Sequence, residues 1–166
     1  MSTAHSDFVS TVEQVESVPV VSSRKATSNH RCLVISTSQK QRAMLSKAAL
    51  DGGWGTVVCS DAGSALTEFR RHRFQLIFID LAGTSTASDG EFRNVCRQLA
   101  VEGRDLLLVV CGRQADPREE IWARQLGIWL YLAGVTEEGA VTELCDEARG
   151  VVERLNGKVE GKTSRV

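Results

Sequence analysis

An apolar run that ends on a carboxylate offers the clearest chemistry in this sequence. Residues 76–79 are wholly apolar, and the residue that follows them is Asp80. Charged side chains are rarely buried without a partner, so an aspartate at the end of a strand-like run requires a reason. In open α/β sheets, ligands bind outside the carboxyl ends of strands, which is where Asp80 would lie. Asp80 is therefore the first candidate for a functional carboxylate, or else a carboxylate that caps a helix or bonds to loop amides.

A second cluster of polar side chains, Ser36, Thr37 and Ser38, follows another apolar run and precedes a helical pattern. Hydroxyl groups and free backbone N–H groups at a helix N-terminus can bind an anion. The same cluster can serve only as a helix cap, in which Ser38 bonds to the backbone at Gln41. Both interpretations stay open: an anion or small-ligand site at Ser36–Ser38, or ordinary capping by Ser38.

Length, composition and charge describe an ordinary globular chain. It has 166 residues, 42% of them hydrophobic and 25% charged, which is enough for one domain with a real core. Its formal net charge of −1 gives no electrostatic argument for nucleic acid or an anionic membrane as a partner. The sequence shows no bilayer-length apolar run and no basic-then-apolar leader. We therefore expect a cytoplasmic protein that binds neither nucleic acid nor a membrane.

The cysteines and histidines do not form a metal-binding pattern. The five cysteines contain no C-x-x-C pair and match neither zinc spacing nor a secreted disulfide framework; they are Cys32, Cys59, Cys96, Cys111 and Cys145. Cys32, Cys59 and Cys111 lie in apolar runs, where free cysteine behaves as a small buried hydrophobe. The histidines have no i,i+4 partner. No metal site is expected.

From residue 31 onward, strand and helix patterns alternate. Strands are predicted over residues 32–35, 56–59, 76–80, 106–111 and 128–132. Helices are predicted from Ser38 to Gly52-Gly53, over 62–71, from Asp116 to Gly127, and from Thr136 to Gly157. A further helix is predicted between the third and fourth strands, after a polar loop of Ala82–Gly90. The last helix carries the strongest apolar stripe, at Val141, Leu144, Ala148, Val151 and Leu155.

Five strand-then-helix units with short connections predict an α/β fold, a doubly wound sheet of five parallel strands with helices on both faces. The strands are continuous apolar runs rather than alternating ones, as expected for strands buried on both sides. Residues 1–30 are rich in Ser, Thr and Val and predict a flexible N-terminal tail. The domain is expected over residues 31–157, followed by a short polar C-terminal tail over 158–166.

Several residues give the domain a specific resemblance. The residues that carry the resemblance are Ile79-Asp80, Asp89-Gly90, Ala65-Leu66, and Gly127 followed by Tyr131. The domain resembles the response-regulator receiver domain of two-component signalling systems. The resemblance covers about residues 31–155, roughly three quarters of the chain. It implies a flavodoxin-like (βα)5 fold with strand order 2-1-3-4-5, and it makes Asp80 the phosphoacceptor-equivalent position.

The resemblance also implies that the parts around Asp80 have been replaced. The family's magnesium-binding acidic pair matches Ser36 and Thr37, its lysine matches Gly134, and its switch hydroxyl falls on Cys111 or Gly112. Phosphoryl transfer depends almost entirely on positioning and charge neutralisation, which these residues do not supply. We therefore expect weak or absent Mg²⁺ binding, no cofactor and a degenerate, pseudo-receiver type of domain. Tyr131 matches the family's aromatic switch position, and a fixed conformation is expected for it.

Three functions are compatible with the residues. The first is an atypical, non-enzymatic receiver that acts as a protein-binding module in phosphorelay signalling. The second is a working receiver phosphorylated on Asp80 by a histidine kinase. The third is a flavodoxin-like domain that binds an anion or small ligand through Ser36–Ser38.

The chain ends shortly after the last helix, so we expect a stand-alone domain whose partners are signalling proteins, such as a histidine kinase or a second copy. In receivers, the face formed by the fourth helix, fifth strand and fifth helix makes such contacts. Here it would offer Trp122 on the fourth helix, with Trp129 and Tyr131 alternating to one side of the fifth strand.

Overall fold

Five parallel strands form one sheet in the computed structural model, which describes residues 29–134 and 137–160. The order is β2-β1-β3-β4-β5, as the resemblance implied. The strands are β1 (Arg31–Ile35), β2 (Gly55–Cys59), β3 (Leu76–Asp80), β4 (Leu107–Gly112) and β5 (Leu130–Ala133). The helices are α1 (Gln39–Asp51), α2 (Ala62–Arg71), α3 (Thr86–Glu102), α4 (Pro117–Gln125) and α5 (Glu138–Glu160). The predicted doubly wound α/β fold is confirmed.

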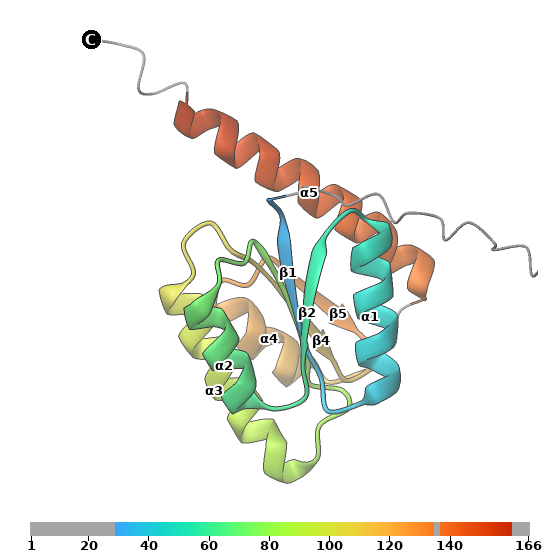
Figure 1. Cartoon of the computed structure of the whole chain (residues 1–166). Helices are drawn as coiled ribbons and strands as arrows, with labels where there is room; N and C mark the ends of the chain where they lie inside the picture. The colour runs from blue at the N-terminus through green and yellow to red at the C-terminus, as the bar shows by residue number, and fades with distance from the viewer. Residues whose placement is uncertain (1–28, 135–136, 161–166) are drawn as a thin grey trace, which may run out of the picture.

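Helices cover both faces of the sheet, with α2, α3 and α4 on one side and α1 and α5 on the other (Figure 1). Successive side chains of a strand point to opposite faces, so the central strands feed both layers. In β3, Ile77 and Ile79 pack toward α2–α4, whereas Leu76 and Phe78 pack toward α1 and α5. This double burial explains why the strands are continuously apolar.

Trp54 anchors the α1–α5 layer. Its side chain is buried in the loop between α1 and β2, and its indole Nε1–H donates to the carbonyl oxygen of Cys145 on α5 at 2.9 Å. A buried tryptophan needs such an acceptor, because its one polar group would otherwise be unpaired.

The predicted helix caps are confirmed at two starts. The Ser38 hydroxyl accepts from the backbone N–H of Gln41, and the Asp116 carboxylate accepts from that of Glu119. Gly53 and Gly127 follow α1 and α4 with φ of 85° and 75°, a backbone region that favours glycine. Capping and terminating signals in the sequence therefore place these helices correctly.

The predicted boundaries of β1, β2 and β4 differ from the structure by one residue, and larger errors occur at α3, β5 and α5. The polar loop expected over Ala82–Gly90 is shorter, because Ser85 caps α3 and the helix begins at Thr86. The fifth strand begins at Leu130 rather than at Ile128. Helix α5 continues through Gly157, where the prediction ended it, to Glu160.

The buried stripe of α5 also differs from the prediction. Val141 and Ala148 are buried as expected, but they are joined by Cys145 and Val152, while Leu155 is 36% exposed. The C-terminal end of α5 projects beyond the sheet (Figure 1). The predicted N-terminal tail, apart from residues 29 and 30, and the predicted helix start at Thr136 lie outside the described residues.

All five cysteines are buried and free, which confirms the packing role predicted for Cys32, Cys59 and Cys111. Burial raises the pKa of the Cys96 and Cys145 thiols to about 12. Such thiols stay protonated and unreactive at neutral pH. Separately, none of the helices described has the length and apolar character needed to cross a membrane.

Candidate functional site

Asp80 lies at the C-terminal end of the central strand β3, and its side chain is fully buried. One carboxylate oxygen, Oδ2, accepts a hydrogen bond from the Ser36 hydroxyl at 2.6 Å. The other, Oδ1, accepts from the backbone N–H of Gly83 at 3.3 Å. The parallel pairing of β1 and β3 brings the ends of both strands to the same edge, which places residues 36 and 80 together. A hydroxyl and an amide therefore solvate Asp80.

The loop after β3 closes over Asp80. The Thr37 hydroxyl donates to the carbonyl oxygen of Gly83 at 2.9 Å, which joins the β1–α1 loop to the β3–α3 loop. A Cβ atom added at Gly83 would lie 3.0 Å from Asp80 Oδ2 and 3.4 Å from the Ser38 side chain. A side chain at this position would require Asp80 or Ser38 to shift, so glycine favours the close approach of the loop. The Asp80 carboxylate is therefore covered by this loop and separated from solvent.

The Ser36–Ser38 hydroxyls are all used within the protein. Ser36 Oγ donates to Asp80 and accepts from the Ser38 backbone N–H at 3.1 Å. Thr37 bonds to Gly83, and Ser38 caps α1. The Arg42 guanidinium donates to the Ser36 carbonyl oxygen at 2.7 Å and so fixes the backbone of this turn. Of the two predicted roles of this cluster, the geometry shows helix capping, by Ser38 at the start of α1.

The residues at the ends of β1 and β3 do not fit a magnesium ion. Magnesium prefers carboxylates and water in an octahedral shell. Asp80 is the one carboxylate at this position, since Ser36 and Thr37 occupy the pair's positions, and Asp80's oxygens already accept from Ser36 and Gly83. Across the described residues, no cluster of three or more His, Cys, Asp or Glu side chains is placed to hold a metal.

A second buried carboxylate, Glu119, was not identified as a site residue from the sequence. It lies in the first turn of α4, and its side chain has no exposed surface. Oε2 accepts from Arg93 and from the Arg113 guanidinium, each at 2.8 Å, while Oε1 accepts from the Arg113 backbone N–H at 2.8 Å and the Tyr131 hydroxyl at 3.1 Å. Its carboxylate therefore joins α3, α4, β5 and the loop that follows β4.

The Glu119 network reaches the loop above Asp80 through Arg113. The Arg113 guanidinium donates to the Thr84 hydroxyl at 3.2 Å and to Asp89 at 3.1 Å. Partial burial alone would raise the pKa of Asp89, but hydrogen bonds and charges from Arg93 and Arg113 hold it below its usual value. Asp89, part of the predicted Asp-Gly motif, therefore serves as a partner of arginines in the first turn of α3.

The predicted switch positions lie near the ends of the neighbouring strands β4 and β5. Tyr131 is buried, and its ring lies so close to Gly112 that any side chain there would collide with it. Cys111 lies opposite Asp80 in the sheet; burial, with a smaller effect from the Asp80 charge, raises the pKa of its thiol to about 12. Gly134 has φ of 81°, a conformation in which lysine would be strained. Tyr131 is thus held in one place by Glu119 and the gap at Gly112.

Replacing Gly112 by threonine, which would introduce a hydroxyl at the end of β4, is expected to destabilise the domain by about 1–3 kcal/mol through overpacking against Tyr131. Urea unfolding followed by circular dichroism measures the loss. In a double-mutant cycle with Tyr131→Ala, the two losses should be less than additive, because removing the ring removes the collision. Additive losses would contradict the contact.

The predicted interface aromatics are not exposed anchors. Trp122 is half-buried, with the Arg93 guanidinium carbon 4.4 Å from its ring centroid and that of Arg97 at 5.7 Å. Trp129 packs toward α1 and α5, whereas Tyr131 packs toward α2–α4. The prediction that both point to one side is wrong, because Trp129 precedes β5 and the alternation of a strand does not include it.

No protein-family model matches this sequence, and no curated protein sequence matches it. Solved structures do match its fold. NtrX from Brucella abortus has a TM-score of 0.68 at 18% identity over 82% of this chain, which spans only 30% of the NtrX chain. The separate NtrX receiver domain gives 0.62 at 18% identity, covering 70% of this chain and 96% of that one. Vibrio cholerae chemotaxis protein CheY4 gives 0.60 at 16% identity, covering 72% and 98%. At these identities the likeness establishes the fold, which is that of CheY-like receiver domains.

Proposed function

We propose that this chain, which has the fold of CheY-like receiver domains, acts as a protein-binding module in two-component signalling, with Asp80 as a structural carboxylate. It would be a cytoplasmic, non-enzymatic pseudo-receiver that uses neither Mg²⁺ nor another cofactor. The observation that carries the proposal is the burial of Asp80 beneath the Ser36 hydroxyl and the Gly83 amide.

Phosphorylation would require changes that the surroundings of Asp80 oppose. A carboxylate oxygen must reach phosphorus in line with the leaving group, and positive charge must neutralise the transferred oxygens. Asp80 has no exposed surface, and no arginine, lysine or histidine in the described residues forms an ion pair with it. Opening the site would break the Thr37–Gly83 bond and the contacts of Arg113 with Thr84. Transfer to Asp80 therefore lacks both access and charge compensation.

A phosphodonor experiment tests the proposal. The protein is incubated with acetyl phosphate and Mg²⁺, and in parallel with beryllofluoride and Mg²⁺, beside a reactive receiver as a positive control. Intact mass spectrometry is expected to show no phosphoryl adduct, and the amide spectrum no shift that depends on Asp80. An adduct or shift that Asp80→Asn abolishes would establish the working phosphoacceptor and overturn the proposal.

The surface best suited to a signalling partner borders β5, an edge strand of the sheet. Between β5 and α5 lies a groove of about 280 Å³ whose apolar lining includes Leu130, Leu132 and Leu144. On α4, Ile121 is 56% exposed. Apolar side chains at an uncovered edge favour protein contact. We propose this α4–β5–α5 face for a histidine kinase or a second copy, with no role for nucleic acid or membrane.

A further inference from the structure

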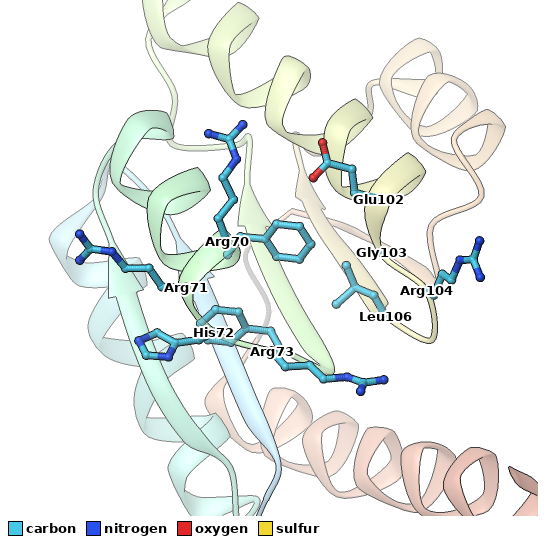
Figure 2. Close-up of a pocket in the computed structure, with 10 residues that line it drawn as sticks. Arg70, Arg71, His72, Arg73, Glu102, Gly103, Arg104 and Leu106 are labelled. Atoms are coloured by element: carbon cyan, nitrogen blue, oxygen red, sulfur yellow. The ribbon is translucent and has the colours of Figure 1, made fainter.

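A second surface lies at the opposite end of the sheet from Asp80. It is a pocket of about 440 Å³ between the C-terminal ends of α2 and α3, beside the starts of β3 and β4 (Figure 2). Because β3 is five residues long, Asp80 lies roughly 15 Å away. Nothing in the Asp80 site or in the α4–β5–α5 face depends on this pocket, so an inference about it stands apart from the proposed function.

Positive charge is concentrated around the pocket. One acidic residue, Glu102, lines the pocket beside four exposed arginines, which are Arg70, Arg71, Arg73 and Arg104. Of these four arginines, only Arg71 forms an ion pair with another described residue, a contact with Glu68 at 4.0 Å. Figure 2 shows Arg70 and Glu102 extending from α2 and α3, Arg73 crossing below Leu106, and Arg104 extending outward. A chain with a formal charge of −1 thus presents a local cationic surface.

Helix stabilisation explains only part of this charge. Arg70 and Arg71 lie in the last turn of α2, where cations favourably meet the negative end of the helix dipole. Arg73 and Arg104 lie beyond the ends of α2 and α3, in the connections to β3 and β4. They neither cap a helix nor pair with an acid in the described part of the chain. Their charges are therefore available to a ligand.

The floor of the pocket is apolar. Phe69 and Leu106 are half-buried in its wall, and Phe74 is buried beneath them. Leu106 reaches this position because α3 ends at Gly103, where any side chain would collide with it. An apolar floor with a cationic rim suits a ligand that carries both an apolar side chain and carboxylates, and the guanidinium fork binds carboxylates well.

The helix ends distinguish a peptide from a compact anion. Both α2 and α3 direct their C-terminal carbonyl groups, with partial negative charge, toward this end of the domain. A phosphate ion would meet those carbonyls unfavourably, whereas a peptide supplies N–H donors to them and carboxylates to the arginines. We propose that this pocket binds an acidic peptide segment of a partner protein, with an apolar residue on Phe69 and Leu106 and carboxylates against Arg73 and Arg104.

Fluorescence anisotropy with the full chain tests this proposal. The probe is a labelled ten-residue peptide of aspartate and glutamate with a central leucine-phenylalanine pair. Arg73→Glu combined with Arg104→Glu is expected to weaken its binding at least about tenfold. The matched control, Lys40→Glu combined with Arg118→Glu, makes the same charge change at exposed residues elsewhere and should keep most of the affinity. Circular dichroism melts verify that both variants fold.

Other results would overturn the proposal. Equal weakening in both double variants would mean that only net charge attracts the peptide. Equal binding of a peptide with alanines in place of leucine and phenylalanine would also mean that only charge attracts the peptide, because the apolar floor would then contribute nothing to the affinity. Stronger competition by inorganic phosphate or a single-stranded oligonucleotide than by unlabelled peptide would assign the pocket to another ligand class. Absence of measurable peptide binding at low salt would reject it outright.

Discussion

Glu119→Ala is expected to lower the free energy of unfolding by about 3–5 kcal/mol, the cost of breaking a buried charge pair by removing one partner. The carboxylate has no exposed surface and accepts four hydrogen bonds, two of them from guanidinium groups. Without it, Arg93 and Arg113 retain only Asp89 as a shared acidic partner, and the Tyr131 hydroxyl loses its acceptor. Urea unfolding at neutral pH, followed by circular dichroism, measures the change.

The neighbouring Glu120 provides a matched control. It forms an ion pair with Arg124 on the same helix at 2.7 Å, but these side chains are 38% and 65% exposed. Exposed pairs of this kind contribute little, so Glu120→Ala should cost no more than about 0.5 kcal/mol. Similar losses in the two variants would show that Glu119 is not the buried centre of the α3–α4 contact.

Ser36→Asp is expected to destabilise the protein by several kcal/mol relative to Ser36→Asn, on the order of 3–5 kcal/mol at neutral pH. Ser36 contacts Asp80 in a fully buried position, so the aspartate would place a second carboxylate against the first. Asparagine has the same shape without the charge and can donate to Asp80. The difference between the two variants therefore isolates the repulsion.

The pH dependence and Mg²⁺ provide two further readouts for this pair. Repulsion raises the pKa of one carboxyl in the folded state, so the destabilisation is full above that pKa and disappears as pH falls to the unfolded value near about 4. Millimolar Mg²⁺ should stabilise the aspartate variant and leave the asparagine variant unchanged. Equal stability of both variants at neutral pH would contradict the buried contact of residue 36 with Asp80.

Local sequence signals predicted most of the fold. Apolar runs located the strands because the central ones are buried on both sides, and Ser38 and Asp116 located helix starts because their side chains cap them. The family resemblance placed residues 36 and 37 near Asp80, but the hydrogen bond from Ser36 to Asp80 was not predicted. The loop over 82–90 was overestimated because the cap at Ser85 pairs with Ser88 rather than with Glu or Gln.

The Glu119 network could not have been read from the sequence. Its arginines come from positions 93 and 113, on another helix and in another loop, and no spacing rule links them to Glu119. The sequence offered one indication, a charged residue on the side of α4 that also carries the buried Ala123, four residues later. The face of Trp129 was assigned wrongly because the strand was predicted to begin at Ile128, whereas β5 begins at Leu130 and the alternation of side chains does not extend to Trp129.

The length of α5 has a mechanical consequence. At 1.5 Å per residue this helix is about 35 Å long, roughly twice the span of a five-residue strand. Leu155 and Asn156 still border a cavity with Phe74 and Gln75 at the start of β3, so residues 157–160 form about 6 Å of helix that extends beyond these contacts. So short a segment would not stay helical alone; it does so by continuing a helix already nucleated against α1 and the sheet. The end of α5 therefore follows the orientation of its packed part, because its last turn has no helix start of its own.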